Sequence, residues 1–314
     1  MMKGAKDMPD VVVIGAVNMD IGAVSLSPLV AKDSNPGRVG TSLGGVGRNI
    51  AHNLCLLGVD TAMVTVLGED HFADAIRRNA REIGLDLSHS AAVPGGRTST
   101  YVFVADSNGD MALAVNDMAI YDHITPDFLA QRVDFINSAK MVVIDTNLPA
   151  ESIAWLCDHC TAPIVADPVS TIKAEKLRPI MGRLFAVKPN RIEAELLSGV
   201  KIESEADVAA AAEKLLDTGL QQVYISLSDR GIYAASRTGE KARFGCPKIH
   251  IVNATGGGDA MVAALTASLL RGDGLTRTAQ NAICAGAFAS TAETTIHPQM
   301  SWNELEKLRE SEAI

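Results

Sequence analysis

The chain has 314 residues, 47% of them hydrophobic, and a formal net charge of -9 at pH 7. This length and apolar content allow a large buried core, whereas the negative charge argues against a nucleic-acid partner, because phosphate backbones are bound by clustered Lys and Arg. The apolar run at 11–17 is too short for a signal peptide or a membrane span, so we expect a soluble protein with no membrane partner.

Short Val/Ile-rich runs alternate with amphipathic stretches along the chain. Buried strands are predicted at 11–17, 61–67, 141–145, 164–166, 185–187 and 223–227. Helices are predicted at 48–57, 72–83, 150–159, 204–218 and 261–271, and four of these are followed at once by a glycine. This alternation predicts an α/β fold, with a doubly wound, mostly parallel central sheet and helices on both faces.

Two segments, 19–44 and 99–116, lack helical periodicity. Runs at 100–105 and 111–115 flank Asp106-Ser-Asn-Gly-Asp110, which is a hairpin signal. We therefore expect a small β-lid on one domain that spans 1–314. Ligands of open α/β sheets lie beyond the carboxyl ends of the strands, so such a lid is placed to close over a substrate and exclude water.

An early glycine motif, Gly44-Gly-Val-Gly-Arg-Asn-Ile-Ala51, runs from the predicted lid into a helix. It lacks the third glycine of the dinucleotide fingerprint and follows no buried strand, which argues against a nicotinamide enzyme. Gly40-Thr-Ser42-Leu-Gly44 matches the serine-hydrolase elbow formally. Pro36 and Gly37 precede it, however, and the helix begins several residues late, so a hydrolase is disfavoured.

The five cysteines, at 55, 157, 160, 246 and 284, do not describe a disulfide framework. A reducing compartment fits best, and we expect a cytoplasmic location. Cys157-Asp-His-Cys160 has redox or metal spacing, but no second pair completes a zinc site. We interpret these two cysteines as ordinary residues of the predicted helix at 150–159.

The most informative motif is Asn253-Ala-Thr-Gly-Gly-Gly-Asp-Ala260. Gly256, Gly257 and Gly258 let backbone N–H groups approach phosphate oxygens, and the helix that follows favours an anion at its N-terminus. Asp259 is then placed to accept a proton from a substrate hydroxyl that attacks a terminal phosphate. The alternative is a Gly-rich turn whose aspartate only complements the helix dipole.

Together, 44–51 and 255–259 resemble the two signatures of the ribokinase-like (PfkB-type) carbohydrate kinases, and the resemblance covers about residues 10–300. It implies a kinase that uses ATP and Mg²⁺, with a monovalent cation such as K⁺ held by backbone carbonyls. It also implies a homodimer paired through the lid.

The resemblance implies three groups of site residues. Its substrate contacts fall on Asn18, Asp20, Gly44, Gly45, Asn49 and Asn147. The family's nucleotide-binding positions correspond to Asp167, Lys188, Asn190, Ser226, Ser228, Gly231 and Thr255. Asn190-Arg-Ile-Glu193 is similar to the family's N-x-x-E motif, which influences Mg²⁺ and phosphate binding, and Glu193 is its metal candidate. The same four residues also have the pattern of a helix capping box, and both interpretations stay open.

Within the family, the sequence segments at 44–51, 114–118, 167–170 and 188–195 resemble those of the pseudouridine kinases. That reaction transfers phosphate from ATP to the 5'-hydroxyl of pseudouridine, with Asp259 as base and the amides of 256–258 stabilising the transferred charge. Donors and acceptors for the base are expected in the lid, at Ser42, Thr100, Asn116 and Asp117, and Lys173 is a further candidate contact to the substrate or to phosphate. Hairpin polarity, and for Lys173 a solvated surface lysine, are the alternatives.

Two other functions remain compatible with the sequence: a kinase of another nucleoside or sugar, of the ribose, adenosine or fructose type, and a non-catalytic nucleoside sensor. The chain also departs from the family pattern at three positions. Asn253 stands where Asp is common, Gly257 where Ala is usual, and Ser228 where the nucleotide site often has a glycine.

Overall fold

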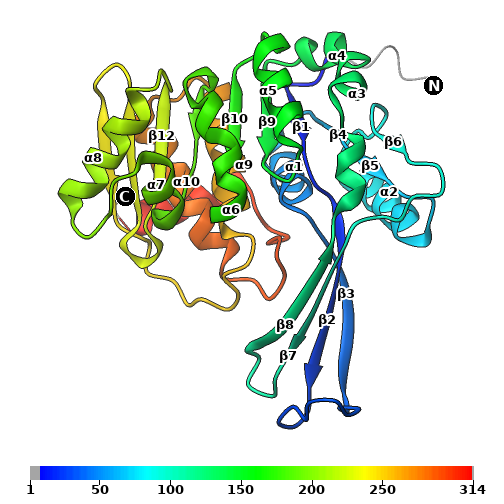
Figure 1. The fold of residues 1–314 in the computed structure, drawn as a ribbon. Helices are drawn as coiled ribbons and strands as arrows, with labels where there is room; N and C mark the ends of the chain where they lie inside the picture. The colour runs from blue at the N-terminus through cyan, green and yellow to red at the C-terminus, as the bar shows by residue number, and fades with distance from the viewer. Residues whose placement is uncertain (1–7, 313–314) are drawn as a thin grey trace.

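The computed structural model describes residues 8–312. Within this range, eight strands form a central sheet in the order β14-β13-β12-β11-β10-β9-β1-β4 (Figure 1). Neighbours from β4 to β12 run parallel, and β12, β13 and β14 are antiparallel. The strands are β1 (Val11–Ile14), β4 (Thr61–Val64), β9 (Met141–Asp145), β10 (Ile164–Asp167), β11 (Ala186–Val187), β12 (Gln222–Ser226), β13 (Ile232–Ser236) and β14 (Lys241–Phe244). The predicted doubly wound, mostly parallel α/β fold is confirmed.

Helices cover both faces of this sheet. Successive side chains of a strand point to opposite faces, so Val12 and Ile14 belong to one core, whereas Val11 and Val13 belong to the other. The first core packs on α3 (Pro126–Ala130), α4 (Val133–Ser138), α5 (Ala150–His159), α6 (Thr171–Ala174), η2 (Glu175–Arg183), α7 (Arg191–Ser198) and α8 (Glu205–Leu216). The second packs on α1 (Val46–Leu56), α2 (His71–Ile83), α9 (Gly257–Leu270), α10 (Leu275–Ala289) and α11 (Trp302–Ser311). Over residues 8–312, none of the helices has the length and apolar character that a bilayer crossing requires.

The structure corrects several element boundaries. The predicted strand at 61–67 is interrupted at Thr65, whose amide donates to Ser90 Oγ (3.1 Å) and whose hydroxyl donates to the Gly15 carbonyl (2.8 Å). Its continuation, β5 (Val66–Leu67), pairs instead with β6 (Ala91–Ala92). Helices α1 and α9 begin before the predicted residues 48 and 261. The prediction started them too late because glycines, which have low helix propensity, occupy their first turns. The antiparallel strands β13 and β14 were not predicted.

A second sheet, which we call the lid sheet, projects from the body of the molecule (Figure 1). It has the order β3-β2-β7-β8 and lies in the segments for which the sequence predicts a lid. Its strands are β2 (Asn18–Ser25), β3 (Gly37–Gly44), β7 (Thr100–Ala105) and β8 (Met111–Asp117). The hairpin predicted around 106–110 is confirmed by the antiparallel pairing of β7 with β8.

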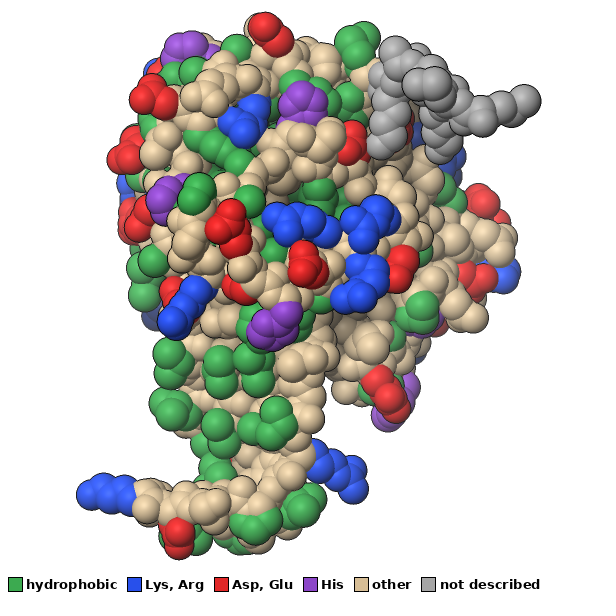
Figure 2. All heavy atoms as spheres, turned by 90° about the vertical axis from the view of Figure 1, so that its right-hand side faces the viewer, with side chains coloured by type: hydrophobic (Ala, Val, Ile, Leu, Met, Phe, Trp, Pro, Cys, Tyr) green, Lys and Arg blue, Asp and Glu red, His purple; other side chains and the backbone are tan. Residues whose placement is uncertain are grey.

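The two faces of the lid sheet differ in character. Directly opposed residues share a face. One face therefore carries the rows Thr41, Ile21, Val102, Val115 and Val39, Ala23, Val104, Leu113. Val39, Leu113 and Val115 on this face are each more than 60% exposed. Figure 2 shows hydrophobic side chains gathered over the projecting sheet. We call this the apolar lid face.

Candidate active site

The N-terminus of α9 has the geometry of an anion site. Its N-cap, Gly256, has φ +85°, and a Cβ there would lie 2.3 Å from the Thr295 carbonyl oxygen, so only glycine fits. Gly257, Gly258 and Asp259 form the first turn, whose amides have no partner within the helix. A Cβ on Gly258 would lie 3.5 Å from Lys188 Nζ, which places a cation beside these amides. An anion bound here meets both the amides and the ammonium group.

Asp259 is partly exposed and is held by one specific contact. Its Oδ2 accepts a hydrogen bond from Asn49 Nδ2 at 2.8 Å. Burial, followed by the charge of Asp167, raises the pKa of Asp259 to about 8, although Asn49 and Lys188 oppose this rise. A carboxyl group with a pKa near neutrality can take up and release a proton under physiological conditions, as a general base must.

Asp20, on β2, packs against the end of β3, just before α1, the helix that carries Asn49. Asn18 donates a side-chain hydrogen bond to Asp20 from the same strand, β2. A Cβ on Gly44 would lie 2.2 Å from Asp20 Oδ2, so the carboxylate packs directly on the glycine backbone. Gly45 follows as the N-cap of α1. Burial raises the pKa of Asp20 to about 6. These polar groups can bind substrate hydroxyls next to Asp259.

Asp145, at the end of β9, ties the floor of this site together. It is fully buried, and its Oδ2 accepts from the amides of Ala16 (2.8 Å) and Gly47 (2.7 Å). Its Oδ1 accepts from the amide of Asn147 at 2.8 Å. One carboxylate thus joins the exits of β1 and β9 to the first turn of α1. The sequence places Asp145 at a strand end but carries no signal for this role.

Lys173 is partly buried and contacts a second predicted substrate residue, Asn147, so it is not a solvated surface lysine. Its ammonium group donates to Asn147 Oδ1 and lies 3.6 Å from Met118 Sδ. Its side chain is partly buried, and burial lowers the pKa of Lys173. Two predicted substrate residues are therefore joined in one contact beyond the end of β9.

The lid candidates divide between the two faces of the lid sheet. Ser42, Asp20, Tyr101 and Asn116 form one cross-strand row. Thr100 and Asp117 oppose each other in the neighbouring row, on the other face. The structure therefore groups Ser42 and Asn116 with Asp20 and separates Thr100 and Asp117 from it. Tyr101 was not identified from the sequence, because its place beside Asp20 depends on the parallel pairing of β2 with β7.

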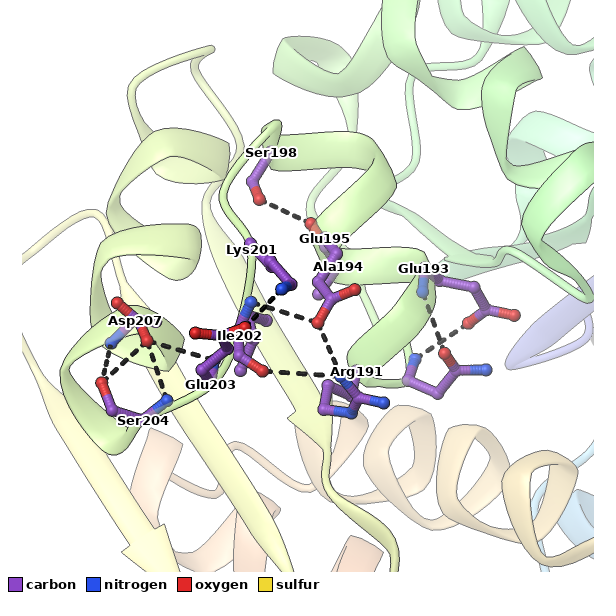
Figure 3. Close-up of polar contacts among 11 residues, drawn as sticks. Arg191, Glu193, Ala194, Glu195, Ser198, Lys201, Ile202, Glu203, Ser204 and Asp207 are labelled. Atoms are coloured by element: carbon purple, nitrogen blue, oxygen red, sulfur yellow. Dashed lines mark hydrogen bonds and ion pairs between the residues drawn. The ribbon is translucent and has the colours of Figure 1, made fainter.

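On the nucleotide side, the N-x-x-E motif forms a capping box. Asn190 Oδ1 accepts from the Glu193 amide (2.9 Å), and Glu193 Oε2 accepts from the Asn190 amide (2.8 Å) (Figure 3). Burial raises the pKa of Glu193, and the charges of Lys188 and Asp167 also act on it. Lys188 Nζ lies 3.9 Å from Asp167 Oδ2, and both side chains are buried. The capping role is thus observed, next to a buried cation and a second carboxylate.

The turn after β12 contains two residues with positive φ, and the first of them, Ser228, is not a glycine. Ser226 donates its amide to the Pro189 carbonyl at 2.9 Å. Ser228 has φ +54° and Gly231 has φ +92°. A left-handed conformation costs a non-glycine residue about 1–2 kcal/mol, so Ser228 adopts, at that cost, the turn that a glycine would adopt freely.

Thr255, the last predicted nucleotide residue, lies just before α9. Its amide donates to Asn253 Oδ1 at 2.9 Å.

The structure does not support the serine-hydrolase elbow or a redox or metal role for Cys157 and Cys160. Ser42 lies within the exposed strand β3 and not at a strand-to-helix elbow. Cys157 lies in α5 and Cys160 caps its C-terminus, and burial raises the pKa of both thiols, which makes them poor nucleophiles. Among residues 8–312, no cluster of three or more His, Cys, Asp or Glu side chains is arranged to hold a metal ion.

Comparison with known proteins gives consistent matches across the chain. Residues 8–302 match the pfkB family carbohydrate kinase. The chain is 36% identical over 292 residues to the pseudouridine kinase of Escherichia coli (strain K12), covering 93% of each protein. It is 26% identical to the guanosine-inosine kinase of Exiguobacterium acetylicum, covering 83% of this chain and 88% of that protein. The ribokinase structure from Thermotoga maritima shares the fold, with a TM-score of 0.84 at 20% identity over 96% of this chain and 99% of that chain.

The Asp145 contacts predict a large stability loss for Asp145→Asn. An amide group must turn its NH₂ toward at least one of three buried N–H donors, so we expect the free energy of unfolding to fall by at least about 2 kcal/mol. Urea unfolding followed by circular dichroism measures this. The control is Asp158→Asn, which removes a half-exposed ion pair with Arg183 and should cost less than about 1 kcal/mol. Equal small losses in both variants would contradict the assigned role.

Proposed function

The chain belongs to the pfkB family of carbohydrate kinases and is a phosphotransferase with an alcohol acceptor; from that premise we propose that it phosphorylates the 5'-hydroxyl of pseudouridine with ATP. The observation that carries the chemistry is the position of Asp259, in the first turn of α9 and hydrogen-bonded to Asn49. The similarity to the E. coli pseudouridine kinase supports the choice of acceptor.

Each group in the site has a proposed part in the transfer. The substrate hydroxyl gives its proton to the Asp259 carboxylate as its oxygen attacks the terminal phosphorus of ATP. The amides of 256–258 and the Lys188 ammonium stabilise the negative charge on the transferring group. Asp20 and Asn49 hold the ribose hydroxyls, and the pair of Asn147 and Lys173 offers a polar contact to the substrate.

Metal ions are part of the proposal. Bound Mg²⁺ supplies charge neutralisation of the ATP phosphates, and it is usually held through phosphates, water and few carboxylates. The two carboxylates near Lys188, Asp167 and Glu193, fit that limited role. A monovalent cation such as K⁺ would need backbone carbonyls. The loops at 253–256 and 290–295 lie side by side, since Asn253 donates to Ser290 O and Glu293 O, and other carbonyls of these two loops are the candidates.

The lid is proposed to act in two ways. Its polar row of Ser42, Asp20, Tyr101 and Asn116 faces the substrate and closes over it. Its apolar lid face pairs with a second copy of the chain, because a patch of exposed valine and leucine side chains on a projecting sheet needs cover. We also place the protein in the cytoplasm, where thiols such as Cys157, Cys160, Cys246 and Cys284 stay reduced.

A panel of acceptors tests the proposed substrate. Purified protein with Mg-ATP is offered pseudouridine, uridine, adenosine, guanosine, inosine, ribose and fructose, and ADP release is measured. We expect the highest kcat/KM for pseudouridine, and mass spectrometry should locate the phosphate on the 5'-oxygen. A higher kcat/KM for ribose or for a purine nucleoside would refute pseudouridine as the acceptor and leave the kinase chemistry intact.

The proposed base predicts the effect of Asp259→Asn. This change should lower kcat at least about 10²-fold, because the amide cannot accept the substrate proton. For the unaltered protein, kcat/KM should rise with pH, reach half its maximum near pH 8 and level off above about pH 9, since that parameter reports the free enzyme's base and the pKa of Asp259 is about 8. The control Asp217→Asn alters an exposed carboxylate at the end of α8. Full activity in Asp259→Asn would disprove the mechanism.

The apolar lid face predicts the effect of the double change Leu113→Asp, Val115→Asp. Charges in a buried interface oppose association, so the variant should sediment as a monomer where the unaltered protein sediments as a dimer. Analytical ultracentrifugation at matched concentrations measures this. Ile192→Asp, at an apolar position on α7 that is 52% exposed, is the control. A monomeric unaltered protein would rule out pairing through the lid.

A further inference from the structure

Arg48 is a buried cation in an unfavourable place. It is 7% exposed and lies in the first turn of α1, the positive end of the helix dipole. Burial lowers the pKa of Arg48 to about 10, and its Nε is buried with no hydrogen-bond partner. Both the dipole and the desolvation oppose a charge here. Its contacts therefore have to account for its presence.

Those contacts connect three elements of the structure, β3, α1 and α2. Nη1 donates to the Leu43 carbonyl of β3 (3.0 Å) and to Asn49 Oδ1 (3.1 Å). Nη2 donates to Asn79 Oδ1 of α2 at 3.1 Å and lies 3.1 Å from His52 Nδ1. Burial and the charge of Arg48 lower the pKa of His52 to about 4, so this ring is neutral at physiological pH and accepts from the guanidinium.

The contact with Asn49 decides how its amide is oriented. A guanidinium group only donates hydrogen bonds, so the Asn49 atom beside it must be the oxygen. The NH₂ of the same amide then points to Asp259 Oδ2, at 2.8 Å. That arrangement favours the ionised carboxylate, which accepts hydrogen bonds, over the protonated form, which donates one.

We propose that Arg48 is a positioning residue that sets the Asn49 amide so that Asp259 is kept ready to accept a proton, and that it links this pair to lid strand β3 through Leu43. The role rests on the proposed function only in that Asp259 serves as the base. Arg48 itself lies behind Asn49 and acts through it.

Other charges around Asp259 define what the loss of Arg48 should change. Asp167, on β10, and Asp145, on β9, both raise its pKa, whereas Lys188, after β11, lowers it. Arg48 contributes a further positive charge from α1. Without Arg48, the Asn49 amide is free to turn its oxygen toward Asp259, and both changes favour the protonated acid. The defect should therefore be largest at low pH and shrink as the pH rises.

The test compares Arg48→Met, which keeps an unbranched side chain but removes the guanidinium group, with the unaltered protein from pH 6 to pH 9. If the pKa of Asp259 rises by about one unit, kcat/KM falls about tenfold at pH 7 but only about twofold at pH 9. Arg48→Lys, which keeps the charge without the planar fork, should show the same trend to a smaller extent and decides the matter if Arg48→Met does not fold. The matched control is Arg77→Met on α2, whose guanidinium only pairs with Asp74 at the surface.

A second measurement separates this proposal from the proposed function. Carbon-13 NMR of the ligand-free protein, with the Asp259 resonance assigned through Asp259→Asn, follows the carboxyl titration without any turnover. A higher pKa of Asp259 in Arg48→Met supports the positioning role even if pseudouridine proves not to be the acceptor. An unchanged carboxyl titration, or a loss of kcat/KM by the same factor at every pH, would overturn it.

Discussion

The site depends on one buried carboxylate, that of Asp145. Through three amide hydrogen bonds it joins the exits of β1 and β9 to the start of α1. The packing is tight enough that a Cβ on Gly15 would lie 2.4 Å from Asp145 Oδ2. Because α1 carries Asn49, and Asn49 reaches Asp259 on α9, the position of the proposed base depends on Asp145 through α1 and Asn49. A rigid floor of this kind is what a reaction that depends on alignment requires.

Three carboxylates lie around Asp259 or belong to it, and the positive and hydrogen-bond-donating groups beside them offset their negative charge. Asp145, Asp167 and Asp259 act on one another and raise the pKa of Asp259. Lys188, the α9 amides and the Asn49–Arg48 pair are the opposing groups. Phosphate binding brings further negative charge, so the amides and Lys188 are needed for the ligand as well as for the protein. The hydrogen bond from Asn49 therefore favours the ionised form of Asp259 only while the Asn49 amide is correctly oriented.

The sequence predicts the sheet, most of the helices and the motif that carries Asp259, because hydrophobic periodicity and glycine placement are local signals. It fails where the signal is not local. The partners of Arg48 include Asn79, 31 residues away, and Asp145 reaches amides 98 and 129 residues away. The sides of Thr100, Tyr101 and Asp117 follow from strand register, which depends on which strands pair. For Asn190 and Glu193, the sequence allowed a cap as well as a metal contact; the capping box is observed, and the metal contact stays a proposal.

The same strands of the lid sheet can carry both the polar row proposed to contact the substrate and the apolar lid face proposed to pair with a second copy, because side chains alternate between the two faces. In β2, Asp20 lies in the polar row and Ile21 belongs to the apolar lid face, and in β7 the same holds for Tyr101 and Val102. A second copy packed on the apolar lid face would restrain the same backbone that presents Asp20 and Tyr101 to the substrate. Restraint of that backbone also passes to β3, where Leu43 accepts from Arg48. Assembly through this face would thereby be connected to the position of the lid and to the orientation of the proposed base through backbone and side-chain hydrogen bonds.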